Sequence, residues 1–398
     1  MKKFLIIASS AAAVFVAGCA KNVIIEKEVE STPISFGVYT SRLATKAGGE
    51  AGTQTLITLG DASKSGFGVF CYFSDNSAGG NTNDYAAGSP SNFYPNFMWN
   101  EQVQGNGNGS ANPSTWTYSP IKYWPNERNT TVTDAGVDKL TFFAYAPWVN
   151  ADKTSGEVGS PQETEGITSL SHNNVTGDPT LTYVIPTSIA NHVDVLYADA
   201  TSLKNLTKPD GNDAVSFPFK HALTSVVFRV QTFIDGVNAT NNLNDEGAAL
   251  DGATTVTLKE IYFGGASVYP SGTLNLATGV WTPAAATSKA FSKTGLTHNV
   301  TKTKTDVTSM DPIMLIPKDS STEYDIRVVY DVRTVDNNLY AGSVTVTNDI
   351  KNTMNLTLQA GKKNIIDLVL GLYSVKMTAT VTGWEAATAV EVDLPQNN

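Results

Sequence analysis

Short apolar segments separated by turn-forming residues constrain the fold of this chain more than any other feature. Gly, Pro, Asn and Asp punctuate these segments, and no stretch has the period of a helix longer than a few turns. Repeated short strands with turn signals predict an all-β protein built from sandwiches or barrels. The expected strands are Pro33–Thr40, Gly66–Phe73, Leu140–Ala146, Leu181–Ile185, Ser225–Phe233, Thr255–Phe263, Ile313–Ile316, Tyr324–Val332, Leu339–Val346, Asn364–Leu370 and Ser374–Val381.

The composition is typical of an extracellular β protein and unusual for a cytoplasmic enzyme. Charged residues make up 16% of the 398 positions, against about 25% in average proteins, so neutral Thr, Ser, Asn and Gly supply the polar surface. The formal net charge is −10 and no stripe of Lys and Arg is present. Because phosphate binding needs clustered cations, nucleic acid is not expected as a partner.

The first nineteen residues predict export as a lipoprotein. Lys2 and Lys3 precede the apolar run Phe4–Val16, which has the length of a signal-peptide core. Small residues then lead to Cys19, in the order of a bacterial lipobox. We therefore expect residues 1–19 to be a lipoprotein signal, Cys19 to carry the lipid, and the precursor to be anchored to the outer membrane. The alternative is an ordinary signal peptide that contains a cysteine.

Residues 20–46 are expected to form a tether and a propeptide strand that is removed on maturation. Ile34, Phe36 and Val38 alternate, so they share one face of the strand expected at Pro33–Thr40. A small, flexible segment follows and contains Arg42 and Lys46, which makes it a good protease substrate.

The length favours two or three domains. Lys204–Asp213 has the Pro, Gly and Asp content of a linker and lies near the middle of the chain. It separates an expected N-terminal domain, residues 47–205, from a C-terminal one, residues 214–398. Ser74–Pro113 and Asp235–Gly252, rich in small polar residues, are expected to be long surface loops.

Catalytic and metal-binding motifs are absent from the sequence. It contains neither a G-x-S-x-G elbow nor an H-E-x-x-H zinc motif. His221 lies between apolar groups and Cys71 alternates with aromatic residues, so both are interpreted as structural. We therefore expect no enzyme activity, no catalytic residues, no cofactor and no metal.

An aromatic cluster offers a second interpretation. Trp99, Trp116 and Trp124 lie in a stretch dense in Phe and Tyr. Such rings can stack on sugars, so these three residues are candidate ligand contacts. The competing and favoured interpretation is that they fill a sandwich core.

Four groups of residues, with the lipobox, resemble the fimbrillin family of the Bacteroidales, which comprises the type V pilins and their Mfa-like relatives. The similarity extends over nearly the whole chain, and the order and spacing of the set make it specific. The groups are Trp116–Pro125 with Leu140–Pro147, Asp194–Ala198, Phe217–Val230, and Val381–Glu385 with Val390–Leu394.

This resemblance implies two transthyretin-like Greek-key β-sandwich domains in tandem. It also implies a subunit that reaches the cell surface as a lipoprotein and is cut after a basic residue by a trypsin-like or gingipain-like protease. The cut removes an N-terminal strand, and a strand from another fimbrial subunit then fills the exposed groove. In the sequence, Val375–Val381 and Ala389–Leu394 have the alternation of donor strands.

Two questions stay open at this level. The family's cleavage residue is usually Arg, whereas the matching site here reads Thr45-Lys46-Ala47, with Arg42 as the alternative. Shaft, anchor and tip subunits share the fold, so a surface-anchored adhesin that binds a glycan or a protein is the alternative function.

Overall fold

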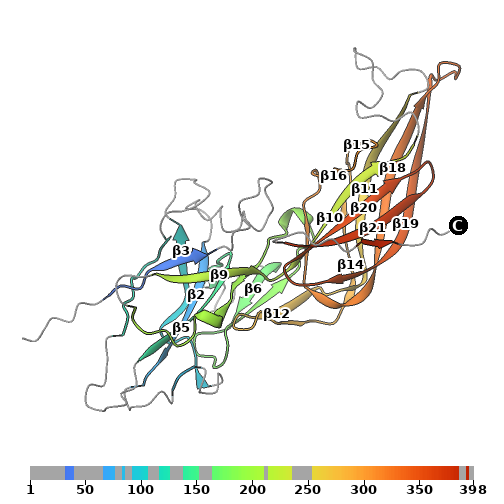
Figure 1. Ribbon diagram of the computed structural model, residues 1–398. Coiled ribbons are helices and arrows are strands. Elements are labelled where there is room, and N and C mark those ends of the chain that lie inside the picture. The colour runs from blue at the N-terminus through green and yellow to red at the C-terminus, as the bar shows by residue number, and fades with distance from the viewer. Residues whose placement is uncertain are drawn as a thin grey trace, which may run out of the picture. The chain divides into compact units, whose positions relative to one another are not determined.

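The computed structural model describes residues 32–39, 66–76, 83–85, 92–105, 116–125, 138–151, 164–209, 214–234, 253–384 and 391–393. In these ranges the chain forms strands, two short 3-10 helices and turns (Figure 1). The 3-10 helices are η4 (Ile189–Asn191) and η5 (Ala200–Ser202). No helix in the described ranges is long and apolar enough to cross a membrane.

The first sheet has seven strands in the order β1-β9-β8-β5-β2-β3-β4. Only β1 and β9 pair in parallel; the other neighbours are antiparallel. Its strands are β1 (Phe36–Tyr39), β2 (Phe67–Ser74), β3 (Met98–Gly105), β4 (Trp116–Thr117), β5 (Lys139–Ala146), β8 (Leu196–Ala198) and β9 (Val215–His221).

The second sheet has the order β13-β12-β7-β6 and is antiparallel throughout. It joins segments that are far apart in the sequence, since β12 pairs with β7 from Ser271–Val184 to Asn275–Thr180. Its strands are β6 (Gly166–Leu170), β7 (Thr180–Val184), β12 (Ser271–Asn275) and β13 (Trp281–Pro283).

Two further sheets are built from the C-terminal half of the chain. One has the order β16-β10-β20-β21-β22 with β17 also on β10, and the other has the order β14-β11-β18-β19 with β15 also on β11. The first contains β10 (Thr224–Thr232), β16 (Thr305–Asp306), β17 (Ile313–Leu315), β20 (Lys362–Leu370), β21 (Val375–Gly383) and β22 (Glu391–Asp393); the second contains β11 (Thr254–Val268), β14 (Thr287–Lys293), β15 (His298–Val300), β18 (Lys318–Val335) and β19 (Ser343–Leu358).

Two hydrophobic cores hold these sheets together. In the larger one, Phe70, Tyr72 and Tyr145 of the seven-stranded sheet share a core with Tyr183 of the second sheet, and the same core continues into the two C-terminal sheets. The smaller core covers the opposite face of the seven-stranded sheet. Because both faces of that sheet are apolar, β2 and β5 are buried along almost their whole length.

The all-β prediction is confirmed, and the expected strands Gly66–Phe73 and Leu140–Ala146 correspond to β2 and β5. The loop expected over Ser74–Pro113 is wrong in part, because it contains β3. The strand expected from Leu339 begins only at Ser343, since residues 336–342 form a turn. The loop expected at Asp235–Gly252 lies outside the described residues.

The division into domains 47–205 and 214–398 stays a prediction. β9 follows the expected linker yet lies inside the seven-stranded sheet. In the linker itself, the N–H of Leu206 donates to the carbonyl oxygen of Leu140 at 2.7 Å, so its described part is bound to the start of β5.

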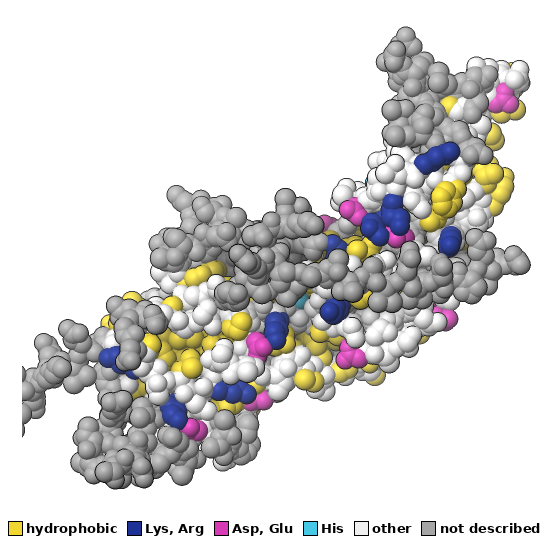
Figure 2. Space-filling model, viewed as in Figure 1, with side chains coloured by type: hydrophobic (Ala, Val, Ile, Leu, Met, Phe, Trp, Pro, Cys, Tyr) yellow, Lys and Arg dark blue, Asp and Glu magenta, His cyan; other side chains and the backbone are white. Residues whose placement is uncertain are grey.

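On the face shown in Figure 2, charged side chains are scattered among neutral ones.

Candidate functional site

The N-terminal strand β1 lies at an edge of the seven-stranded sheet, next to β9 (Figure 1). The N–H of Val215 in β9 donates to the carbonyl oxygen of Ser35 at 2.8 Å. On the other side, the N–H of Ile34 donates to the carbonyl oxygen of Lys122 at 2.9 Å. Residues 32–39 therefore occupy a site with backbone partners on both sides, which we call the N-terminal strand slot.

Phe36 fills an aromatic cage in this slot. Its ring centroid lies 4.9 Å from that of Tyr118, 5.5 Å from that of Phe217 and 6.0 Å from that of Phe142. The side chain is 5% exposed and that of Ile34 is 2% exposed. Burying each side chain of this size contributes about 1.5–3 kcal/mol, so the slot holds the strand mainly through these two residues.

Tyr118 links the cage to the backbone of the bound strand. Its Oη donates to the carbonyl oxygen of Ile34 at 2.9 Å and accepts a hydrogen bond from the N–H of Lys122 at 3.2 Å. Burial raises the pKa of Tyr118 to about 12. The phenol therefore stays protonated at neutral pH and keeps its role as donor.

Pro218 directs its backbone polar groups toward β8, not toward β1. It lies opposite Tyr39 and has no N–H to donate. Its carbonyl oxygen is used on the other side of β9, where it accepts a hydrogen bond from the N–H of Asp199 at 2.9 Å. Because the N and the carbonyl oxygen of one residue point to the same side of a strand, the missing N–H is lost from the pairing with β8, whereas Val215 on the β1 side still donates to Ser35.

The structure brings together part of the predicted site. Ile34 and Phe36 lie in the smaller core, and Val38 packs against it while partly exposed. Cys19, Arg42 and Lys46 lie outside the described residues, so lipidation and cleavage there stay predictions.

The three tryptophans that were candidate ligand contacts pack against the cores. Trp124 is 3% exposed, and its ring meets Phe142 edge-on. Trp116 meets Phe67 edge-on and is half-buried. Trp99 packs against the larger core, and its Nε1 donates to the carbonyl oxygen of Ser171 at 2.9 Å. These positions match the core-filling interpretation.

The two segments with donor-strand alternation differ in their surroundings. Val375–Val381 belongs to β21, which pairs along its length with β20 and carries the buried residues Met377 and Ala379. Of Ala389–Leu394, the described part is β22, an edge strand that pairs with β21 over three positions only. The first segment is thus an interior strand of its own sheet, whereas the second lies at an edge.

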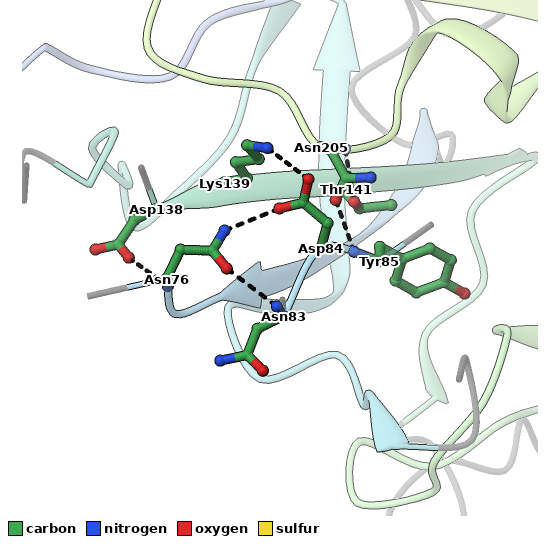
Figure 3. Close-up of polar contacts among 8 residues, drawn as sticks. All are labelled: Asn76, Asn83, Asp84, Tyr85, Asp138, Lys139, Thr141 and Asn205. Atoms are coloured by element: carbon green, nitrogen blue, oxygen red, sulfur yellow. Dashed lines mark hydrogen bonds and ion pairs between the residues drawn. The ribbon is translucent and has the colours of Figure 1, made fainter. Parts of the chain in front are cut away.

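A polar cluster joins residues 83–85 to β5 and to the expected linker (Figure 3). The Asp84 carboxylate accepts from Lys139 Nζ at 2.5 Å and from Asn76 Nδ2 at 2.9 Å. The N–H of Tyr85 donates to Asn205 Oδ1 at 2.7 Å. Both oxygens of Asp84 therefore bind protein donors, which makes the cluster structural. In the described ranges no group of three His, Cys, Asp or Glu side chains is arranged to hold a metal ion.

His221 and Cys71 both lie in packed surroundings. His221 Nδ1 lies 2.6 Å from Asp194 Oδ2, and its ring stacks on Trp384 at 3.9 Å between centroids. Cys71 is fully buried, and burial raises the pKa of its thiol. A thiol held neutral in this way is a poor nucleophile.

Sequence reasoning found the buried face of the N-terminal strand but not its receptor. Tyr118, Phe142 and Phe217 were visible as aromatic residues in expected strands or clusters, and none was assigned to the slot. The alternation of Phe217 and Phe219 about Pro218 was the available signal for a strand with one apolar face.

Comparison with known proteins places the chain in a family. Residues 61–384 match the fimbrillin-like family. A fimbrial protein from Bacteroides vulgatus is 21% identical with a TM-score of 0.63, over 89% of this chain and 99% of that one. A fimbrial assembly protein from Parabacteroides distasonis is 10% identical with a TM-score of 0.34, over 90% and 99% of the two chains. Curated proteins give no match. The match to the family model covers most of the chain, and the chain therefore belongs to the fimbrillin-like family.

Proposed function

We propose that this chain is the precursor of a structural subunit of a surface fimbrium, and that it polymerises by exchanging its own N-terminal strand for a strand of another subunit. The observation that carries this proposal is the position of residues 32–39. They lie at a sheet edge with Phe36 in a deep aromatic cage, and the chain beyond them contains Arg42 and Lys46. Membership of the fimbrillin-like family supports the same function.

Cleavage after Lys46 or Arg42 by a trypsin-like or gingipain-like protease starts assembly. In the uncleaved precursor the strand is tethered to its slot, so its high effective concentration excludes a competing strand. Cutting the tether lets the strand leave. The edge of β9 and the cage of Tyr118, Phe142 and Phe217 are then exposed together, and an incoming strand can satisfy both.

The slot defines what an incoming strand must carry. It takes large apolar side chains at alternate positions, as Ile34 and Phe36 supply in the precursor. Ala389–Leu394 has this alternation through Val390, Val392 and Leu394. Its described part is held by three register positions of β22 on β21, so releasing it costs little compared with removing β21. We therefore favour this segment as the donor.

The precursor reaches the cell surface as an outer-membrane lipoprotein anchored through Cys19. The order of the leader supports this step: two lysines, an apolar run and small residues before the cysteine. Its partners are other fimbrial subunits, the maturation protease and, before cleavage, the outer membrane.

Electron microscopy of two protein preparations tests the proposal. Wild-type precursor and the double variant Arg42→Ala, Lys46→Ala are each treated with trypsin and imaged on grids. We expect filaments from the wild type and folded monomers from the variant. Filaments of normal length from a variant shown by mass spectrometry to be uncut between residues 40 and 50 would overturn strand exchange after cleavage. A variant with Lys351→Ala, distant in sequence and on β19, serves as the matched control and is expected to polymerise.

A further inference from the structure

A hollow on the solvent side of the sheet β14-β11-β18-β19 is unrelated to the N-terminal strand slot. Its volume is about 690 Å³, within the range of about 300–1,000 Å³ that small-molecule sites occupy. Along β18, Tyr324, Ile326 and Val328 are buried in the core while Asp325 and Arg327 alternate with them and face outward. The lining residues are Tyr262, Asp325, Ile326, Arg327, Lys351, Asn352 and Thr353.

The strand register explains why the sheet is hollowed at this place. Asp325 lies between Gly264 of β11 and Thr353 of β19. Gly264 has no side chain, and a Cβ there would lie 2.3 Å from the carbonyl oxygen of Lys289 in β14. Of the three paired positions Gly264, Asp325 and Thr353, the one on β11 therefore has no side chain. A larger residue at position 264 would force the backbone of β14 to move.

Arg327 forms a fixed part of the hollow. Its Nε and Nη2 donate to the Asp349 carboxylate at 2.7 and 3.1 Å, and its Nη1 donates to Glu260 at 2.9 Å. The guanidinium lowers the pKa of Asp349, so this carboxylate stays ionised. Paired on both sides, Arg327 presents a planar surface whose charge is already balanced, rather than an open anion site.

Three other groups in the hollow have hydrogen-bonding capacity to spare. In the described part of the chain, no ion pair or side-chain hydrogen bond occupies the Asp325 carboxylate, the Lys351 ammonium or the Tyr262 hydroxyl. They supply an acceptor, a donor and a group that does both. Two cations face three carboxylates here, counting Glu260 and Asp349, so the hollow has little net charge to attract a strongly charged ligand.

From this arrangement we infer a binding site for a neutral oligosaccharide on the outer face of β11, β18 and β19. Sugar hydroxyls both donate and accept, so they match separate donors and acceptors in one shallow hollow. The half-buried ring of Tyr262 offers an apolar surface for the face of a pyranose. Such a site would give each subunit its own contact with a glycan-coated surface, independently of strand exchange.

The test uses the full chain with Cys19→Ala, uncleaved, on an array of neutral and sialylated oligosaccharides. We expect neutral glycans to bind, and calorimetry with the best of them to give a dissociation constant that rises roughly tenfold or more in Asp325→Asn and in Tyr262→Phe. Asp319→Asn is the matched control, because Asp319 is exposed on the same strand outside the lining, and its affinity is expected to equal the wild type's.

Three results would overturn the inference: no neutral glycan bound, sialylated glycans alone bound, or Asp325→Asn binding as tightly as Asp319→Asn. Circular dichroism of each variant confirms that folding is unchanged, which the exposed position of Asp325 predicts. Since the protein is uncleaved throughout, the outcome does not depend on whether the fimbrial proposal is correct.

Discussion

Replacing Phe36 by alanine tests how the slot holds the N-terminal strand. The ring is 5% exposed and lies within 4.9–6.0 Å of three aromatic rings, measured between centroids. Truncating a buried phenylalanine costs about 3–5 kcal/mol. Because β1 is a short edge strand, we expect most of this loss to appear as local undocking of residues 32–39 rather than as global unfolding.

Hydrogen exchange of the Val215 amide reports on this undocking, since that N–H donates to Ser35. A loss of about 3 kcal/mol corresponds to exchange roughly 100-fold faster. Val38→Ala is the control: its side chain is only partly buried, so we expect an effect of roughly tenfold or less. The Ile366 amide in β20, in the C-terminal sheet, should exchange equally slowly in all three proteins.

Two results would refute this reasoning. If Val215 exchanged less than tenfold faster in Phe36→Ala, the cage would not be what holds the strand. If Ile366 lost as much protection as Val215, the strand would be part of the cooperative core, and its removal on maturation would unfold the subunit.

Three further predictions follow from the described contacts and the leader. Asp367→Ala should lower the free energy of unfolding by about 2–3 kcal/mol in urea titrations, because this buried carboxylate pairs with the partly solvated Arg229 and Lys304. No change would contradict a role for these ion pairs in stability. Burial lowers the pKa of His192 to about 4, and its Nδ1 accepts a hydrogen bond from the Met314 N–H. As the pH falls, the unfolded chain therefore takes up the proton first, and the free energy of unfolding should fall between about pH 6.5 and 4, by about 2–3 kcal/mol at pH 4.5. The variant His192→Gln should show a smaller fall; a fall as large as the wild type's would assign the effect to other groups. Cys19→Ala should abolish palmitate labelling and keep the precursor from the surface; normal labelling would exclude the lipobox.

At residues 336–342 the structure has a turn where the sequence pattern predicts the start of a strand. Leu339 and Tyr340 are apolar, so the sequence pattern predicts a strand that includes both residues. In the structure the N–H of Gly342 donates to the carbonyl oxygen of Leu339, and Gly342 has a φ of +66°. The left-handed backbone that glycine allows closes the hairpin there, and Tyr340 lies fully exposed.

The sequence pattern does not predict β3, for a different reason. A register shift opposite Val69 and Cys71 interrupts its pairing with β2, and Asn100 takes a positive φ of 49°. The extra residue breaks the alternation, so the buried Met98 and Val103 are five positions apart. A search for a period of two does not find such a strand.

The sequence by itself determined which segments are strands where both faces are buried, because continuous apolar runs such as residues 66–73 and 140–146 have few alternatives to the interior of a sheet. It also determined that Ile34 and Phe36 share one buried face. Only the tertiary structure decided what that face meets. Phe36 lies opposite Val215, far along the chain, and strand pairing over such separations depends on the complementary surfaces of distant segments, which no local periodicity records.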